Sequence, residues 1–508
     1  MNNNNPEPST PSTDSADNGS PAQPPSLWLA LTPLLVLFTL LGYNVAVYGD
    51  DSLGGANQAA LILAAALAAG LGIARGAVWP HIQERITDNI RAATPAVLIL
   101  LLVGALTGTW LIGGVVPSMI YYGLQIFNPA FFIVSACVVM GLAAVVIGSS
   151  WSTSATLGVA LMSIGYALGF NPGLVAGALV SGAYFGDKMS PLSDTTNLAS
   201  GVSNVDLFTH IRYLSMTALP SIIITLAIYL LIGLFTTADS GAAQGTERYQ
   251  EIIREYFHVS PLLLLVPAGV IFLIVKKVPA LPALFCGAVL GALSAATFQL
   301  PLLQSLAEQF GGIYQTIMQA VYGSISIATG DEILDELLSS GGMAGMLNTI
   351  WLILSAMVFG GTMEASGFLA RITQALLSRV RSDAGLVTAT GATCLVTNVS
   401  ASDQYLALVV PGRMFTRAYE DRGLAPQNLS RTLEDTGTVT SVLVPWNTCA
   451  AYHASVLGVA TLSYAPWAFF CLISPAMTLL FAWRRIRIAR IDDNSNTSYL
   501  QNQADRAG

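Results

Sequence analysis

Long apolar stretches recur along this 508-residue chain and constrain its fold more than any other feature of the sequence. Hydrophobic residues make up 53% of the chain and charged residues only 10%, whereas soluble domains carry about 25% charged residues. An α-helix needs about 20 apolar residues to cross a bilayer. Such stretches lie near 27–48, 57–74, 95–113, 217–236, 258–275, 280–297, 343–362 and 466–483. Together with two apolar regions that polar residues interrupt, 129–200 and 384–460, they predict an all-α polytopic membrane protein with about ten crossings.

Both ends of the chain are polar. Residues 1–26 are rich in Asn, Pro and Ser and predict a disordered tail. They contain no Lys or Arg and so lack the basic start of a signal peptide, which makes the stretch from Leu27 a retained first span. We expect a transporter domain over 27–485 and a cytoplasmic C-terminal tail over 486–508. The apolar stretches make a lipid bilayer the expected surrounding. The net charge is −8 and the sequence has no basic patch, so nucleic acid is not an expected partner.

Lys and Arg predict the orientation because they concentrate in cytoplasmic loops. They cluster after the second span, between 258–275 and 280–297, around 384–460 and after the last span. Placing these clusters inside puts both termini in the cytoplasm. Segment 237–257 is the exception, because it is predicted to lie outside and yet contains Arg248 and Arg254.

A constant shift of 248 residues superposes the two halves of the hydropathy pattern and carries Asp187 onto Asp435. The corresponding spans are predicted to cross in opposite directions, which indicates inverted repeats over about 78–236 and 326–484, as in many secondary transporters. Each repeat is expected to contain a re-entrant hairpin and one interrupted crossing. The alternative is a set of ordinary helices with small residues on their packing faces.

Polar residues gather in four segments of the interrupted regions, where backbone freed from helical bonding must find partners or line a wet cavity. Segment 148–156 has six hydroxyls in nine residues, and segment 186–197 has two carboxylates. Segments 397–405 and 433–448 combine carboxylates with hydroxyls and amides. Carboxylates at membrane depth are costly and usually mark an ion pathway. The candidate binding residues are Asp187, Asp194, Asp403, Asp435, Ser150, Thr153, Ser193, Thr196, Asn197, Asn398, Ser402, Thr438 and Asn447.

Asp194 and Asp403 are the preferred ion-coupling carboxylates and the predicted Na⁺ ligands, because neither has an adjacent basic residue and both are expected to sit deepest in their hydroxylated segments. Asp187 could instead pair with its neighbour Lys188, and Asp435 could cap a helix. Any single hydroxyl could bond to its own backbone. In a site of low dielectric a carboxylate can hold either a proton or Na⁺, and competition between the two couples opposed fluxes.

The polar segments resemble those of the NhaC-type sodium/proton antiporter family of the ion-transporter superfamily. The resemblance is carried by GDKMSPLSDTTNLAS at 186–200, TNVSASDQYLALVVPGRMF at 397–415 and LEDTGTVTSVLVPWNTCAAY at 433–452. It covers roughly 27–485. It implies a carrier of the bacterial inner membrane that exchanges Na⁺ for H⁺ and binds its ions at paired hairpin tips and interrupted helices.

Exchange of Na⁺ for H⁺ by alternating access is therefore the expected function, with no enzymatic activity and no cofactor other than the transported ions. The alternative is an organic-anion exchanger of the malate/lactate type coupled to Na⁺ and H⁺, although the few basic residues of the candidate segments favour a cation. An ion channel or a membrane scaffold is a third class, against which the inverted halves argue. The ion ratio and the oligomeric state, a homodimer included, are left open.

Overall fold

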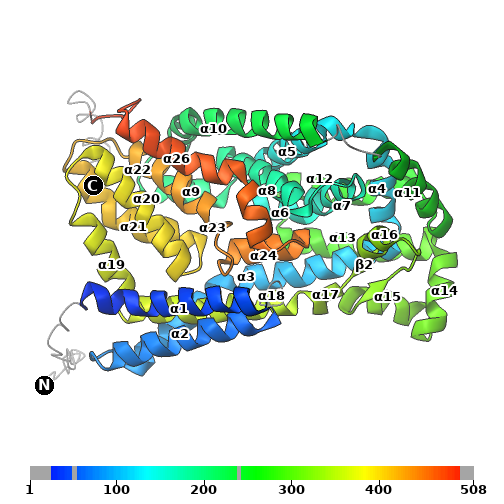
Figure 1. The fold of residues 1–508 in the computed structure, drawn as a ribbon, viewed down its shortest axis with the longest axis horizontal. Coiled ribbons are helices and arrows are strands. Elements are labelled where there is room, and N and C mark those ends of the chain that lie inside the picture. The colour runs from blue at the N-terminus through cyan, green and yellow to red at the C-terminus, as the bar shows by residue number, and fades with distance from the viewer. Residues whose placement is uncertain (1–24, 49–53, 237–241, 492–508) are drawn as a thin grey trace, which may run out of the picture.

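The computed structural model describes residues 25–48, 54–236 and 242–491, which form an elongated bundle of helices (Figure 1). The predicted polar tails lie largely outside these residues. Seven helices of the described part are long and apolar enough to cross a membrane. They are α1 (Leu27–Tyr48), α2 (Ala56–Ile73), α3 (Trp79–Ile112), α5 (Pro129–Ile147), α10 (Leu207–Thr236), α13 (Ala280–Phe298) and α18 (Leu347–Ala365). The chain is a multi-pass, all-α membrane protein, as its sequence predicts.

Two of the predicted spans are bent pairs of helices instead of single straight ones. Glu247–Tyr256, the described end of α11 (Ala242–Tyr256), meets Pro261–Val275 at 92°. Thr461–Trp467 meets α26 (Phe469–Trp483) at 55°. Each bend lies next to a proline, Pro261 or Pro466, which lacks the N–H that would continue a helix. The remaining elements of these pairs are η4 (Pro261–Leu264), α12 (Leu265–Val275), α25 (Thr461–Tyr464) and η6 (Ala465–Trp467).

The helices of both polar regions are interrupted, as predicted. In the first region, breaks at 148–149 and 190–193 separate α5 from α6 (Ser150–Thr153) and α8 (Pro172–Met189) from α9 (Asp194–Val202). In the second, breaks at 401–403 and 442–447 separate α20 (Asp383–Ser400) from α21 (Gln404–Glu420) and α23 (Val439–Ser441) from α24 (Thr448–Leu457). The other segments are the π-helices η2 (Ser154–Gly158) and η5 (Glu434–Thr438), α7 (Val159–Ala167) and α22 (Gln427–Leu433).

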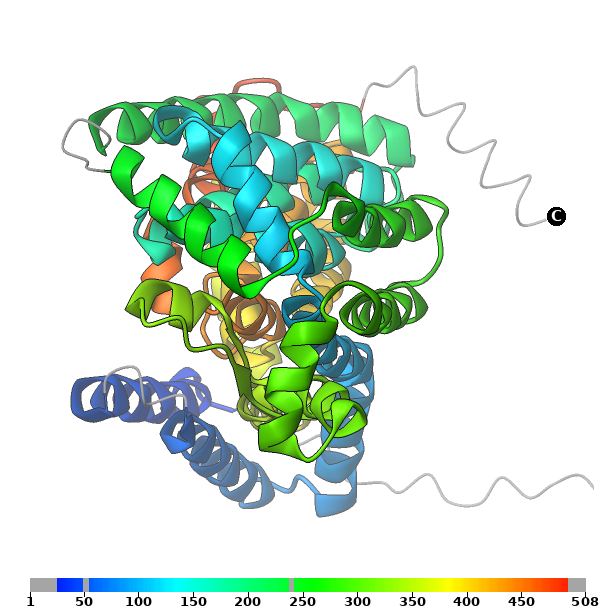
Figure 2. The same ribbon diagram turned by 90° about the vertical axis from the view of Figure 1, so that its right-hand side faces the viewer.

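The long helices run between two ends of the molecule. The start of α1 and the end of α26 lie at the same end as α19 (Phe368–Leu377), α21 and α22 (Figure 1). Figure 2 looks onto the opposite end. This end carries α11, α14 (Leu300–Phe310), α15 (Ile313–Tyr322) and α16 (Glu332–Leu337). The antiparallel strands β1 (Ile325–Ser326) and β2 (Ser339–Ser340) flank α16. The predicted membrane topology and the sidedness of the two ends stay predictions.

The predicted shift of 248 residues carries the ranges of α3, α4 (Val115–Ile126), α5 and α10 onto ranges that overlap α18, α19, α20 and α26. The first part of α3 has no helical counterpart of its own length, because 326–341 holds β1, α16 and β2, and α17 (Gly342–Gly345) is short. The inverted relation of the two repeats and the re-entry of the hairpins stay predictions.

Small residues let α5 and α8 pack very closely. A Cβ atom added at Gly182 would lie 2.1 Å from the Cys137 carbonyl oxygen, and one added at Gly186 would lie 2.1 Å from the Gly141 carbonyl oxygen. Without a hydrophobic driving force between helices in lipid, close approach of this kind supplies the van der Waals contact that holds them together. It also fixes the depth of Asp187, which directly follows Gly186.

Candidate ion-binding site

A cavity of about 540 Å³ lies where the four breaks converge. We call it the vestibule. It reaches the surface at the loop between α12 and α13, where Lys277 and Pro279 are exposed lining residues. The polar residues of its wall come from both halves of the chain and are Ser149, Ser152, Asp187, Asp194, Asp403, Gln404, Tyr405 and Thr448, with Lys277 at the mouth.

The first break places Ser150 against Asp187. Gly148 ends α5 with a φ of 77°, a left-handed conformation that favours glycine, and Ser149 then caps α6 by accepting a hydrogen bond from the Ser152 N–H. The Ser150 N–H and hydroxyl both donate to Asp187 Oδ2, at 2.9 and 2.6 Å. The other oxygen, Asp187 Oδ1, is buried and has no hydrogen-bond partner in the described part of the chain. Asp187 therefore has one oxygen free for a ligand.

The break between α8 and α9 presents Asp194. Ser193 caps α9, with its Oγ accepting from the Thr196 N–H at 3.3 Å. Asp194 Oδ2 accepts a hydrogen bond from the Tyr405 hydroxyl at 2.6 Å, which ties α9 to the start of α21. The sequence led us to expect Asp194 at depth; in the structure its side chain is exposed on the vestibule wall.

The second hairpin tip positions Asp403. Ser402 has a φ of 60°, and Asp403 caps α21 by accepting from the Leu406 N–H at 3.0 Å. Asp403 is 4% exposed and lines the vestibule. The same residue therefore caps a helix and forms part of the cavity wall.

The amides of Asn398 and Asn447 hold the end of α20 to the segment from η5 to α24. Asn398 Nδ2 donates to the Gly437 carbonyl at 2.7 Å and to Thr440 Oγ1 at 3.0 Å. Asn447 Nδ2 donates to the Asn398 carbonyl and to its Oδ1, both at 3.1 Å. Backbone groups released by the breaks thus find side-chain partners, as membrane depth requires.

Most other candidate hydroxyls bond within the protein. Thr153 donates to the Ser149 carbonyl, Thr196 to the Lys188 carbonyl, and the Asn197 amide to the Ser193 and Pro191 carbonyls. The hydroxyls of Ser402 and Thr438 differ, since they are buried and meet no partner among the described residues. Each of these hydroxyl groups could still form a hydrogen bond with a ligand, although neither residue lines the vestibule.

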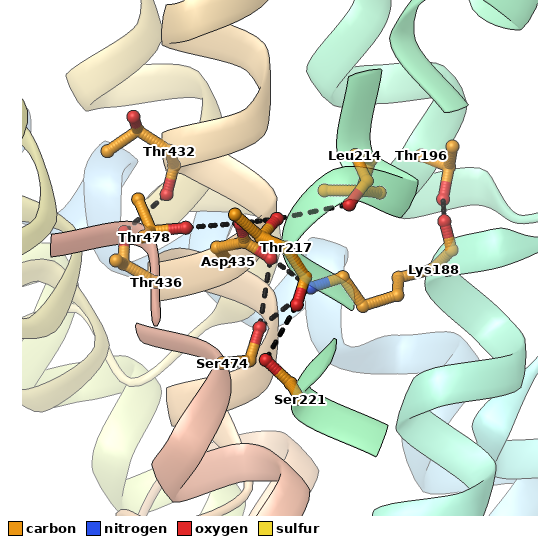
Figure 3. A network of polar contacts seen from close by, with 10 residues as sticks. All are labelled: Lys188, Thr196, Leu214, Thr217, Ser221, Thr432, Asp435, Thr436, Ser474 and Thr478. Atoms are coloured by element: carbon orange, nitrogen blue, oxygen red, sulfur yellow. Dashed lines mark hydrogen bonds and ion pairs between the residues drawn. The ribbon is translucent and has the colours of Figure 1, made fainter. Parts of the chain in front are cut away.

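Asp435 lies at the centre of a separate buried network (Figure 3). Its Oδ1 accepts from Lys188 Nζ and, at 2.9 Å, from Ser474 Oγ; its Oδ2 accepts from Thr217 at 2.7 Å and from Thr478. Lys188 and Asp435 are both 0% exposed. Four donors fill the lone pairs of one carboxylate, so in this conformation Asp435 has no oxygen left for a transported ion. Lys188 pairs with Asp435 and not with its neighbour Asp187, and Asp435 is not a helix cap; both sequence-based alternatives are wrong.

A thin layer separates the vestibule from a second cavity of about 420 Å³. The stretch from α6 through η2 begins at the vestibule with Ser152 and reaches the second cavity at Val159. Helix α24 does the same between Thr448 and Ser455. Within the layer the Trp151 and Tyr452 rings stack with their centroids 4.2 Å apart, and the Tyr452 hydroxyl donates to the Trp151 carbonyl at 2.9 Å (Figure 1 shows α6 and α24).

Sequence reasoning did not assign Tyr405, Trp151 or Lys188 to the site. Tyr405 and Trp151 stand inside the polar segments that it singled out, so position within those segments was the available signal. Asp435, the partner of Lys188, is 247 residues away, so no local sequence pattern indicates the pair. Among the described residues no three His, Cys, Asp or Glu side chains form a metal-binding group, so a Na⁺ ion here would need hydroxyl or carbonyl ligands as well.

Comparisons with known proteins agree with this architecture. The profile of the Na⁺/H⁺ antiporter family matches residues 182–484. The chain is 37% identical to the Na⁺/H⁺ antiporter NhaC of Alkalihalophilus pseudofirmus, over 82% of this chain and 88% of that one. It is 34% identical to the malate-2H⁺/Na⁺-lactate antiporter of Bacillus subtilis (84% and 89%) and 35% identical to the arginine/ornithine antiporter ArcD of Halobacterium salinarum (92% and 94%). The chain belongs to the Na⁺/H⁺ antiporter family.

Proposed function

We propose that this protein exchanges Na⁺ for H⁺ across the membrane by alternating access, with Asp187, Asp194 and Asp403 as the groups for which the two cations compete. One observation carries the proposal: three carboxylates from both halves of the chain line one cavity, with Lys277 at its mouth as the basic lining residue. Such a wall attracts a cation and holds it with carboxylate and hydroxyl oxygens.

Competition for these carboxylates couples the fluxes. A carboxylate that binds Na⁺ must release its proton, and one that takes up a proton loses its affinity for Na⁺. The vestibule and the second cavity approach the layer of Trp151 and Tyr452 from opposite ends. Opening this layer while the vestibule closes would expose the same carboxylates to the other side, which is what alternating access requires.

The orientation follows from the charge pattern. The vestibule opens beside Lys277, which the distribution of Lys and Arg assigns to the cytoplasm. We therefore propose an inward-facing conformation in a bacterial cytoplasmic membrane, with both termini inside.

Exchange of an organic substrate is the second candidate, because two of the similar proteins are named for such substrates: the anions malate and lactate in one case, and the cationic amino acids arginine and ornithine in the other. A dicarboxylate would face three carboxylates in the vestibule. We therefore place cation exchange first. Counterflow of labelled malate, lactate, arginine or ornithine in proteoliposomes separates the two: saturable uptake of any of them would favour the second candidate.

The direct test uses everted membrane vesicles with a pH-sensitive dye. Addition of Na⁺ should dissipate a preformed pH gradient in vesicles with the wild-type chain. Asp403→Asn should lose this response, because the amide cannot release a proton or neutralise Na⁺. A full response from Asp403→Asn would remove this residue from the mechanism.

A further inference from the structure

Glu434 is a buried acid that the vestibule does not use. It is the first residue of η5, it is 0% exposed, and neither of its carboxylate oxygens has a hydrogen-bond partner in the described part of the chain. An ionised carboxylate in such a place would be very costly, because nothing replaces the water it has lost. Asp435 shows the contrast, since it stands next in the sequence and four donors surround it.

The cations near Glu434 are engaged elsewhere. The Nζ of Lys188 is bound to Asp435 and Ser474 and not to Glu434. Arg431, one turn earlier, lies with its guanidinium 4.5 Å from the centre of the Tyr213 ring and forms no ion pair among the described residues. The other buried titratable side chains of the helices packed against η5 are His210, Tyr213 and Tyr229 on α10, Cys394 on α20, Tyr419 on α21 and Cys471 on α26. Apart from Arg431, the charged side chains of these helices, Asp194 among them, are exposed or half-buried. The carboxyl is thus left without a bonded counter-charge, which favours its neutral form.

A proton is the ligand that fits this position. Glu434 lines neither the vestibule nor the second cavity, so neither of them offers room beside it for a hydrated ion or an organic molecule. The one other unpartnered side-chain group of η5 is the Thr438 hydroxyl, four residues on. Both lie in a π-helical turn, a local irregularity that is frequent at functional sites.

Asp187 links Glu434 to the vestibule. Asp187 is joined to η5 through its neighbour Lys188, whose Nζ binds Asp435, the residue after Glu434. Asp187 itself stands on the vestibule wall with Oδ1 unpartnered. Repulsion between the two carboxylates favours a proton on Glu434 while the vestibule is empty. A cation beside Asp187 offsets that charge and removes part of the reason for Glu434 to stay protonated.

We propose that Glu434 is a proton-binding group of the exchange, separate from the vestibule carboxylates, and that it gives up its proton when a cation binds beside Asp187. The O–H bond breaks with its electron pair left on the carboxylate, whose new negative charge the bound cation offsets. The proton passes to the water of the vestibule, and it returns when the cation leaves. This inference rests on the proposed function and adds a proton to those displaced from the vestibule itself.

Proton linkage tests it without transport. Binding of ²²Na⁺ to the purified full-length protein is measured in detergent at a series of pH values. For each proton that Na⁺ displaces, the Kd for Na⁺ falls about tenfold for every unit by which the pH rises. Glu434→Gln should still bind Na⁺, but its Kd should depend on pH with one proton fewer. Glu434→Asp should restore it, and Glu420→Gln, the same change at the exposed end of α21, should leave the pH dependence as in the wild type.

The outcomes separate the inference from the function on which it rests. A wild-type protein with no saturable Na⁺ binding overturns both. Wild-type binding with an unchanged pH dependence in Glu434→Gln overturns the inference and leaves Na⁺/H⁺ exchange standing. Loss of binding in both Glu434→Gln and Glu434→Asp would mean that the carboxyl has a structural role, and it too overturns the inference.

Discussion

Lys188 in α8 and Asp435 in η5 form a fully buried ion pair that joins the two halves of the chain across 247 residues of sequence. Thr217 of α10 and Ser474 and Thr478 of α26 complete the ring of donors (Figure 3). Because Lys188 follows Asp187 directly, this tie also fixes the backbone that presents Asp187 to the vestibule. We regard it as the anchor of the site instead of a part of the ion path.

Removing one partner of this pair should be strongly destabilising. Lys188→Met leaves a buried, uncompensated carboxylate, which costs about 3–5 kcal/mol in proteins. We expect a large fall in the unfolding temperature in detergent. The double variant with Asp435→Asn should be more stable than the sum of the two single losses predicts, since neither charge is then left alone. Lys276→Met, at an exposed lysine, is the matched control. Additive losses in the double variant would show that the two residues are not coupled.

The close packing of α5 on α8 should tolerate no side chain at Gly186. In Gly186→Ala the new Cβ would lie 2.1 Å from the Gly141 carbonyl oxygen and 2.6 Å from Ala144 Cβ, so the helices must separate. We expect a lower yield of folded protein and a lower unfolding temperature. Gly201→Ala has nothing within 4 Å and should be neutral or slightly stabilising, because Ala favours helix by about 1 kcal/mol over Gly. Equal stability of the two variants would argue against this packing.

Tyr405 should orient Asp194 for binding. Tyr405→Phe removes the hydroxyl that donates to Asp194 Oδ2 at 2.6 Å and leaves the ring in place. We expect the Na⁺ concentration for half-maximal exchange to rise about tenfold or more, with the maximal rate less affected, because a net hydrogen bond to a charged group is worth about 1.5–3 kcal/mol. Tyr43→Phe, on the exposed face of α1, serves as the control. An unchanged half-maximal concentration would contradict this role of Tyr405.

At the end that carries α16, acid should loosen the segment between the two short strands. The N–H and hydroxyl of Thr329 donate to Asp335 Oδ1 and hold the pKa of Asp335 below its usual value. A lowered pKa in the folded state means that the stabilisation is present at neutral pH and is lost as the pH falls through that lowered value. The protection factors of 327–338, in which the slower intrinsic exchange at acid pH is corrected for, should therefore fall at acid pH in the wild type. Asp335→Asn should have low protection factors at both pH values, and high protection in this variant at neutral pH would disprove the role of Asp335.

Much of the fold could be predicted from local sequence. The stretch 27–48 coincides with α1, and the four breaks lie within the polar segments, because hydropathy and helix-breaking residues act over a few neighbours. The pairs Lys188–Asp435 and Tyr405–Asp194 could not be predicted, since they depend on how distant helices pack. For the same reason Asp194 was expected at depth, while in the packed structure it is exposed on the cavity wall.

The central claim is that the vestibule carboxylates exchange Na⁺ for H⁺. The most direct measurement places the purified protein in proteoliposomes with a pH dye inside, imposes an inward Na⁺ gradient, and records internal pH without any organic substrate. The account predicts Na⁺-dependent alkalinisation of the lumen with the wild-type chain and none with Asp403→Asn. No pH change in the wild type, or a change that requires added malate, lactate or arginine, would contradict it.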